Sequence, residues 1–476
     1  MRMCFLVSLL VTGGLVGLSI PAGEPAKDPP QRGGQPLTWI HAIGADFRDR
    51  INATVEAPDG GFVLAGESKS FQVASPVDYE IWVLKIDRFG FIEWEFTFGE
   101  DGVSESCWDV VNSNDGGFLV IGGGQQPGSN NADLWILKLN ANGGLVWQKS
   151  YGGPQHDWGR AVTQAQGGGY LAAGTSFSLG STAAAAWLIR IDEDGNSLWQ
   201  GAYGGTEDEL FYDVAPTADG GYVAAGITGR NSSTTKGWVV KVDANGAIQW
   251  QKSVQRPART WVQAILPAAD GGYYITGRWF LAKLDANGNI LWQHGIGEFG
   301  WGLAEDGDGN LYYSATTWIG HVDFSGYRWA KFNSAGDLLL GKLFWAETNL
   351  DEWNRDLLLT SDGGFLLSGW TNDHGLGSGT DDAFILKLSP DGEADADLPE
   401  RIIDFTGPLE ASSLSVSDTA VGGALGNIPA LNLSLTGKAV NSTVTIHGGN
   451  PLIPAWIQWP NLNITALIDL VNQLGL

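Results

Sequence analysis

Aromatic and arginine side chains recur at two fixed distances before a repeated Asp-Gly-Gly marker, and these residue types are suited to binding chemistry. The marker position falls at Asp59, Asp115, Gly167, Asp219, Asp270, Asp308 and Asp362. A first column, nine residues earlier, contains Arg50, Ser106, Trp158, Leu210, Trp261, Phe299 and Trp353. A second column, seven residues earlier, contains Asn52, Trp108, Arg160, Tyr212, Gln263, Trp301 and Arg355. Because strand side chains alternate with period two, both columns should lie on one face of a strand.

Aromatic rings combine flat apolar faces with polar rims, which suits stacking on sugars or insertion into a partner protein. Every copy of the repeat except the first has an aromatic residue in one of the two columns. Packing between adjacent copies is the alternative interpretation, and it is the commoner role of repeated tryptophans. The candidate ligand-binding residues are Trp108, Trp158, Arg160, Tyr212, Trp261, Trp301, Trp353 and Arg355.

Carboxylates are also plentiful near these columns. They include Asp101, Glu105, Asp157, Glu207, Asp208, Glu209, Asp351 and Glu352. A glycosidase needs two carboxyl groups about 5–10 Å apart, one with a raised pKa. The sequence singles out no such pair, so no catalytic residue is assigned. Asp109, Asp213 and Asp356 share a column on the opposite strand face, where hydrogen bonding to a neighbouring backbone is expected.

Two acidic loops could in principle hold calcium. The segments 306–310 and 192–196 carry alternating oxygen ligands, as calcium loops do. Both fall at hairpin positions, which favours simple turns. No histidine pair has zinc-ligand spacing, and Cys107 has no evident histidine partner. We therefore expect no cofactor, with calcium as the open alternative.

The elements that would position these residues are short strands. Each copy has a strand before the marker, a second strand after it, a third of the type Trp-Val-Leu-Lys-Leu-Asp, and a fourth that carries Trp. We call them the a, b, c and d strands. Successive markers are 56, 52, 52, 51, 38 and 54 residues apart, and 68 glycines supply the turns. Seven four-stranded copies predict an all-β, seven-bladed β-propeller.

The two ends of the repeat region predict how the ring closes. The seventh copy reaches Gly392 without its Trp strand. Residues 37–44, Leu-Thr-Trp-Ile-His-Ala-Ile-Gly, resemble the Trp strand at 145–152. We therefore expect the N-terminal strand to complete the last blade, which removes an open sheet edge.

The combined pattern, Asp-Gly-Gly followed by Lys-Leu-Asp-x-x-Gly-x-x-x-Trp, resembles a tandem β-propeller repeat of secreted bacterial and archaeal proteins. The resemblance covers residues 37–392. The segment 284–292 is also similar to the tryptophan-docking repeat of quinoprotein-type propellers. The Asp-Gly-Gly hairpin and the count of seven instead of eight depart from that repeat, and no quinone ligand set is recognisable. The resemblance implies a fold and a secreted location rather than an activity.

The chain ends and the charge bear on location and partners. Residues 1–22 resemble a signal peptide, with an uncleaved membrane anchor as the alternative. Residues 393–411 resemble an acidic linker, and residues 412–476 a β-rich segment that ends in a short helix after Asn463. A formal net charge of −26 disfavours nucleic acid and anionic lipid. We expect a secreted or cell-surface protein with no membrane insertion after signal cleavage.

Three functions remain compatible with these patterns. The leading hypothesis is an extracellular binding, adhesion or protein-interaction module, with a glycan or protein ligand at the mouth of the propeller channel. A carbohydrate-active hydrolase or lyase that uses the mouth carboxylates is the first alternative. A structural surface protein is the second, and it predicts self-association without a small ligand.

Overall fold

Every regular element in the computed structural model is a β-strand, within the residues that it describes. These are residues 37–447 except 46, 71–77, 100–102, 126–130, 180–182, 231–234, 257–258, 319–324, 346–351, 372–380, 395–400, 405–413, 419–422, 426–429, 433–435 and 440–444. Helices long and apolar enough to cross a bilayer are absent from this part of the chain. The signal peptide (1–22) and the terminal helix expected from the sequence lie outside the described residues.

The first four copies of the repeat each form an antiparallel sheet whose a, b, c and d strands follow chain order. The first copy forms β2 (Asp49–Glu56), β3 (Phe62–Ser68), β4 (Glu80–Ile86) and β5 (Ile92–Gly99). The second forms β6 (Glu105–Asn112), β7 (Phe118–Gln125), β8 (Ala132–Leu139) and β9 (Leu145–Tyr151). The third forms β10 (Asp157–Gln164), β11 (Tyr170–Ser176), β12 (Ala185–Ile191) and β13 (Ser197–Tyr203). The fourth forms β14 (Leu210–Pro216), β15 (Tyr222–Thr228), β16 (Lys236–Val242) and β17 (Ile248–Gln255).

The fifth and sixth copies share one hydrogen-bonded sheet, so the described residues form six sheets. Their strands are β18 (Val262–Pro267), β19 (Tyr273–Leu284), β20 (Ile290–Glu305), β21 (Leu311–Trp318), β22 (Ser325–Phe332) and β23 (Leu338–Trp345). The fifth copy has almost no b–c loop, so β19 continues from the b into the c strand. β20 likewise runs from the d strand of the fifth copy into the a strand of the sixth. Trp279, at the sharp bend of β19, has a φ of 69°.

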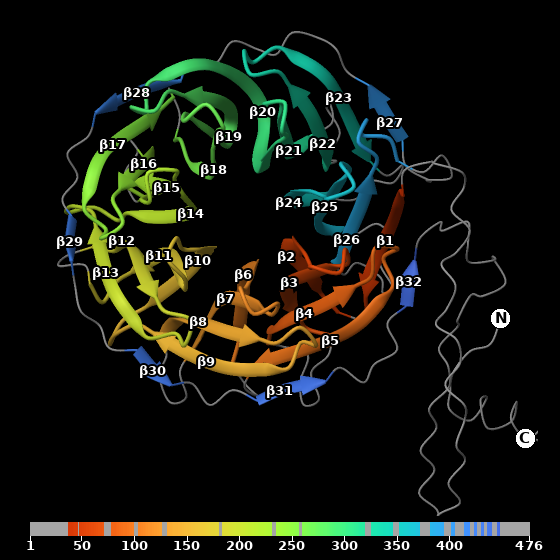
Figure 1. Cartoon of the computed structure of the whole chain (residues 1–476), viewed down its shortest axis with the longest axis horizontal. Helices are drawn as coiled ribbons and strands as arrows, with labels where there is room; N and C mark the ends of the chain where they lie inside the picture. Colours follow the sequence, from red (N-terminus) through yellow and green to blue (C-terminus); the bar gives the residue numbers. More distant parts are fainter. Residues whose placement is uncertain are drawn as a thin grey trace, which may run out of the picture. The chain divides into compact units, whose positions relative to one another are not determined.

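The N-terminal strand closes the ring, as the sequence predicted. The last copy supplies β24 (Glu352–Leu359), β25 (Phe365–Thr371) and β26 (Asp382–Leu388), and β1 (Trp39–Gly44) pairs with β26. The register runs from Trp39↔Lys387 to Ile43↔Ala383. The a strands contact one another in a closed circle, in the order β2, β6, β10, β14, β18, β20, β24 and back to β2. The chain is a β-propeller, with the a strands around the centre and the d strands outside (Figure 1).

Beyond the ring, the chain returns along the outer edges of the sheets. We call β27 to β32 the C-terminal belt. Its strands are β27 (Arg401–Asp404) on β23, β28 (Ser415–Asp418) on β17, β29 (Gly423–Leu425) on β13, β30 (Ala430–Asn432) on β9, β31 (Thr436–Ala439) on β5 and β32 (Thr445–His447) on β1. Figure 1 shows these strands in blue around the ring. The belt covers strand edges that would otherwise be open for pairing with another chain, and β27 lies inside the segment expected to be a linker.

Tryptophans of the d strands join neighbouring sheets at the rim. Trp147 Nε1 donates a hydrogen bond to the carbonyl of Glu193, in the c–d turn of the next copy, at 3.1 Å. The same bond links Trp199 to Ala244, Trp292 to Ser334 and, across the closure, Trp39 to Arg88. Each indole lies so close to the turn that a Cβ on Gly195 would come within 2.9 Å of Trp147. The positive φ of Gly195, 74°, requires glycine as well.

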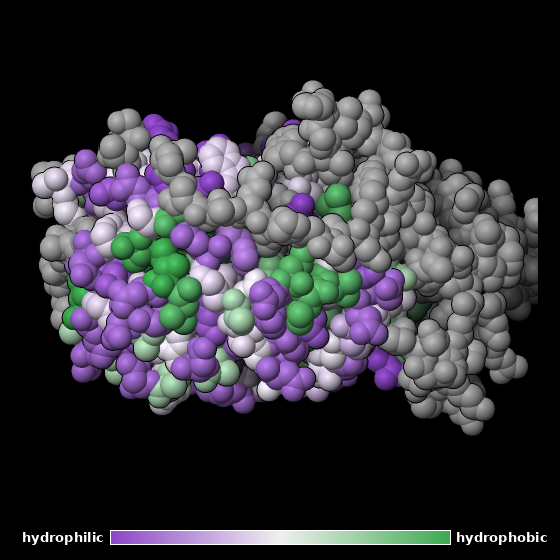
Figure 2. Space-filling model, turned by 90° about the horizontal axis from the view of Figure 1, so that it is seen from above, coloured by the Kyte–Doolittle hydropathy of each residue, from purple (hydrophilic) through white to green (hydrophobic). Residues whose placement is uncertain are grey.

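The described surface on the face that Figure 2 presents is mostly hydrophilic. Figure 2 shows apolar residues in separate patches on the face that it presents, rather than as one continuous area. Four exposed apolar side chains occupy the same position of the d strand in their copies: Val146, Leu198, Leu291 and Leu339. Because this spacing places them on different blades, they do not mark a single docking surface.

Candidate ligand site at the channel mouth

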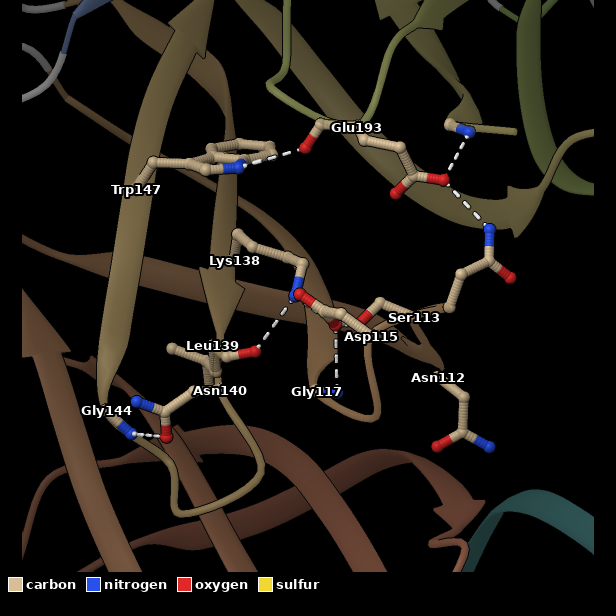
Figure 3. A network of polar contacts seen from close by, with 12 residues as sticks. Asn112, Ser113, Asp115, Gly117, Lys138, Leu139, Asn140, Gly144, Trp147 and Glu193 are labelled. Carbon is tan, nitrogen blue, oxygen red and sulfur yellow. Dashed lines mark hydrogen bonds and ion pairs between the residues drawn. The ribbon is translucent and has the colours of Figure 1, made fainter.

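The most regular polar contact in the molecule lies at the a–b hairpins. The Lys138 ammonium donates to both carboxylate oxygens of Asp115 at 2.8 Å, and Asp115 Oδ1 accepts the Gly117 N–H at 3.0 Å (Figure 3). Equivalent ion pairs join Lys85 to Asp59, Lys241 to Asp219, Lys283 to Asp270 and Lys387 to Asp362. Because the contact repeats with the fold, we assign it to the architecture.

The third copy shows what happens when the marker carboxylate is missing. Gly167 stands at the marker position, and the c-strand lysine is replaced by Arg190. Arg190 donates to the backbone carbonyls of Gly168 and Tyr170. Glu193 accepts the N–H of Gly169 at 2.7 Å, the place that the marker aspartate fills elsewhere. The same hairpin is thus held by different partners, which supports a structural role.

The carboxylates that open the a strands are also engaged in structure. Asp49, Asp157 and Glu209 each accept the N–H of the residue four positions earlier, at 2.9, 2.8 and 3.1 Å. Ser70, Ser178 and Thr228 supply a second hydrogen bond to these three carboxylates. Burial raises the pKa of Asp49 to about 6. These groups close the d–a loops, so Asp157 and Glu209 are poor candidates for a hydrolytic pair, while Asp101 and Asp351 lie outside the described residues.

The third set of acids bonds to neighbouring blades, as the sequence predicted. Asp109, Asp213 and Asp356 accept the backbone N–H groups of Val162, Ile265 and Thr54, each at 2.7 Å. Each acceptor bond crosses from one a strand to the next around the ring. Burial raises the pKa of Asp213 and of Asp356 to about 6 and that of Asp109 well above its ordinary value.

Both candidate columns lie on the half-buried face of the a strands at the channel mouth, by which we mean the end of the channel where these strands begin. Apart from the buried Leu210, every column residue keeps part of its surface exposed, whereas the residue between the two columns is buried in every copy. In every a strand the pairing register shifts at the second-column residue, as between Cys107 and Asp109. The second column therefore consists of β-bulge residues, whose side chains a bulge re-aims.

Two second-column arginines stack on second-column tryptophans of the preceding copy. The Arg160 guanidinium lies 3.7 Å from the centre of the Trp108 ring, and the Arg355 guanidinium lies 4.4 Å from that of Trp301. Within the described residues, neither arginine has a hydrogen-bond or ion-pair partner. Burial lowers the pKa of Arg355 to about 10, so Arg355 remains cationic at pH 7. Burial also lowers the pKa of Arg160.

Glu67 is the carboxylate that faces these arginines, and sequence reasoning missed it. Its Oε1 lies 3.7 Å from Arg50 Nη1, and it also interacts electrostatically with Arg355 and Arg160. Burial raises the pKa of Glu67 above its ordinary value. Arg50 also donates to Asp381 and lies 4.6 Å over the ring of Trp370.

A third column could have found these residues. Eight positions after the marker, on the b strand, stand Glu67, Gly123, Thr175, Ile227, Arg278, Thr316 and Trp370. Register pairs Glu67 with Arg50 and Trp370 with Trp353, so this column lies directly across from the first. Its charged and aromatic members, Glu67, Arg278 and Trp370, all contact first-column residues.

The remaining candidates form aromatic clusters of their own. Trp353 stacks on Trp370 at 5.4 Å and lies 6.3 Å from Phe299. Trp158 lies 5.8 Å from Phe177, edge to face. Arg278 lies 5.3 Å from the Trp261 ring, and burial raises the pKa of Tyr212, which interacts with Arg160. These side chains therefore pack against one another and also keep part of their surface exposed.

Three buried hydrogen-bond donors without partners belong to the column residues or lie across from them. Among the described residues, Arg355 Nε, Trp301 Nε1 and Trp370 Nε1 are shielded from solvent and make no hydrogen bond. An unsatisfied buried donor costs about 1–3 kcal/mol. Other such donors, Trp135 Nε1 and Trp329 Nε1, belong to the core between the sheets.

Metal binding has little support in the described part of the chain, where no group of three or more histidine, cysteine or acidic residues is placed to hold an ion. The two possible calcium loops form turns. Asp306 Oδ1 accepts the N–H groups of Asp308 and Asn310, and Asp192 Oδ1 does the same in its loop. Their carboxylates are thus directed at their own backbone.

Comparisons with known proteins do not assign the chain to a family. No protein-family model matches it, and no curated protein matches it in sequence. Similar solved structures include Sqt1 from Chaetomium thermophilum (13% identity, 78% of this chain and 92% of that one, TM-score 0.43). A Dyadobacter fermentans protein of unknown function matches at 12% identity (75% and 100%, TM-score 0.38), and one from Bacteroides caccae at 15% (54% and 94%, TM-score 0.35). All three TM-scores lie below 0.5, so the fold of this chain is defined by its own strand pairing.

Proposed function

We propose that this chain is an extracytoplasmic binding module that takes its ligand at the channel mouth of a seven-bladed propeller. The count of seven treats the long sheet of the fifth and sixth copies as two blades, because it contributes both β18 and β20 to the circle of a strands. The ligand would contact the candidate residues Trp108, Trp158, Arg160, Tyr212, Trp261, Trp301, Trp353 and Arg355.

The observation that carries this proposal is the pair of arginines stacked on indole rings without a polar partner among the described residues. The charged groups of the repeated lysine–aspartate contacts find partners. Arg160 and Arg355 differ from these groups, and each lies over a partly exposed indole ring. Such convergence of aromatic surface and oriented donors is typical of ligand sites.

A hydrolase is less favoured because five of the described acids near the mouth already accept structural hydrogen bonds. Asp157 and Glu209 close loops, and Asp109, Asp213 and Asp356 bind neighbouring backbones. Glu67 is single, whereas glycoside hydrolysis by the usual route needs two carboxyl groups.

A glycan array probed with the mature chain tests the proposal, with a pull-down from the native surroundings as the protein arm. We expect selective binding that Trp158→Ala and Trp261→Ala each reduce at least fivefold. Val146→Ala, an exposed rim substitution, is the matched control and should leave binding unchanged. The absence of any ligand in both screens, or binding that is indifferent to the two tryptophan variants, would overturn the proposal.

Export can be tested separately. Expression of the complete chain in a secreting host should release a protein that begins near residue 23, as measured by intact mass. Retention of the full-length chain in the cell membrane would favour the uncleaved anchor instead.

A further inference from the structure

We propose that the channel mouth recognises an acidic oligosaccharide, whose carboxylate is gripped by Arg160 and Arg355. This inference rests on the proposed function and deepens it by naming the ligand class. It starts from the contrast between the protein as a whole, with a formal net charge of −26, and this one cationic place.

Among the described residues around Glu67, the charges do not balance. Arg50, Arg160 and Arg355 all interact electrostatically with Glu67. Arg50 also donates hydrogen bonds to Asp381. Arg48 adds a further cation 3.7 Å from Asp381. Guanidiniums therefore outnumber carboxylates in the cluster, and Arg160 and Arg355 keep no ion pair of their own among the described residues. An additional anionic group would restore the balance.

The geometry of the two arginines suits a carboxylate. A guanidinium presents its donors in a planar fork that matches two carboxylate oxygens, and stacking on an indole ring fixes the orientation of that fork. Arg160 and Arg355 are both held in this way, at 3.7 and 4.4 Å from their ring centres. Little side-chain entropy would then be lost on binding.

The aromatic surroundings favour a sugar as the carrier of that carboxylate. Trp353, stacked on Trp370, and Trp158 remain half-exposed on the same strand face. Their rings offer flat surface against which the apolar face of a pyranose can pack.

The overall charge limits the ligand further. A chain of net charge −26 repels a densely charged polymer at long range. The mouth should therefore prefer a short oligosaccharide or a chain end with one or a few carboxylates. A heavily sulfated polysaccharide should bind poorly.

Isothermal titration calorimetry with the mature chain tests this inference. The probes are trigalacturonate, its fully methyl-esterified form, which keeps the rings and removes the charges, and triglutamate, an acidic peptide. We expect trigalacturonate to bind at least tenfold more tightly than either comparison ligand. A charge-assisted hydrogen bond contributes enough that Arg160→Gln and Arg355→Gln should each weaken binding by about tenfold to a hundredfold.

Arg88→Gln is the matched control. Arg88 also stacks on an aromatic ring, that of Phe89 at 4.7 Å, but it lies in the c–d turn of the first copy, away from the a-strand starts. This variant removes the same charge and should leave affinity unchanged. Arg160→Lys and Arg355→Lys keep the charge and the fold, and the loss of the planar fork should still cost about tenfold.

The outcomes separate this inference from the proposed function. Equal affinity for the methyl ester, with binding still lost in Trp158→Ala, would overturn the acidic-ligand inference and leave the binding module intact. Tight binding of triglutamate would overturn the choice of a sugar. Affinity unchanged in both arginine variants, each shown by thermal unfolding to be folded, would overturn the assignment of the carboxylate to Arg160 and Arg355.

Discussion

The rim and the channel mouth of this propeller use tryptophan and charge in opposite ways. At the rim, the same residue makes the same contact in copy after copy, as when Trp147, Trp199 and Trp292 bond to the next c–d turn. At the mouth, the residue at a given strand position varies from copy to copy, and Arg160 and Arg355 stack on indole rings without a hydrogen-bond or ion-pair partner among the described residues. We infer that contacts repeated in every copy serve the assembly of the blades, whereas residues that vary between copies serve one particular site.

The carboxylates follow the same division. Hydrogen bonds from Lys241 and Thr217 lower the pKa of Asp219, at an exposed hairpin, to about 2. Burial raises the pKa of Asp213, beside the channel, to about 6. The hairpin acid is stabilised in its charged form. Burial destabilises the charged form of the inner acid, which accepts a hydrogen bond from the neighbouring blade.

Removing a rim tryptophan should produce the largest loss of stability. Trp39 is buried at the closure and donates to the Arg88 carbonyl at 3.0 Å. Trp39→Ala should lower the free energy of unfolding by about 3–5 kcal/mol, measured by guanidinium denaturation. Trp158→Ala at the mouth should cost clearly less, and an equal loss would contradict the division between rim and mouth.

Breaking a hairpin ion pair should have an intermediate effect. Lys241 is buried and donates to Asp219, which is about half exposed. Asp219→Ala should cost about 1–3 kcal/mol because a buried ammonium loses its main partner. Glu193→Gln in the third copy, where Arg190 bonds to carbonyls instead, should cost less by the same denaturation assay. A reversed order would show that the marker aspartate is dispensable.

The inner acids should give stability a characteristic pH dependence. Because the folded pKa of Asp213, about 6, exceeds the ordinary unfolded value, 3.8, the folded state binds more protons between these values. The free energy of unfolding should therefore fall as pH rises from about 4 to about 7, by about 1–3 kcal/mol for this group.

The test is the difference between wild type and Asp213→Asn, since His41, whose pKa burial lowers to about 4, acts in the opposite direction in both proteins. We expect the stability of the variant relative to wild type to rise with pH across this range, measured by urea denaturation. A difference that is independent of pH would show that Asp213 does not titrate with a raised pKa.

The C-terminal belt should affect association more than stability. Each of its strands spans only three or four residues, so each adds few backbone bonds. A chain that ends at residue 394 should keep the fold and the binding selectivity. Its uncovered edges should promote self-association, detected by light scattering after size-exclusion chromatography. A monomer that no longer binds would instead place the belt in the function of the mouth.

The fold could be predicted from the sequence because repetition makes strand order redundant. Trp39, Trp147 and the Lys138 strand type are enough to align the copies and to predict closure. β19 joins two strands of the fifth copy, and β20 joins the fifth copy to the sixth. The short spacing of 38 residues between the markers of these two copies agrees with this, but the resulting shared sheet was not foreseen. Strands were expected within residues 412–476, where β28 to β32 lie, but β27 was not expected. The pairing of these strands with the outer sheet edges could not be predicted, because strands of three or four residues carry no pattern that selects a partner.

The site was predictable only in part. The two columns located the mouth, since strand alternation determines which residues share a face. The bulge at each second-column residue, which re-aims Arg160 and Arg355, has no signature in the sequence. Glu67 and Trp370 were missed because they stand on the b strand, where the aligned copies differ too much to suggest a shared role.

A matched pair of tryptophans tests the central claim most directly. Trp199 and Trp353 are both half-buried, but Trp199 bonds to a rim turn and Trp353 stacks at the mouth. Binding of both alanine variants to the same glycan array should decide the matter, at a temperature where each is folded. We predict that Trp199→Ala retains the wild-type binding pattern and that Trp353→Ala loses it; retention by both, or loss by both, would contradict the account.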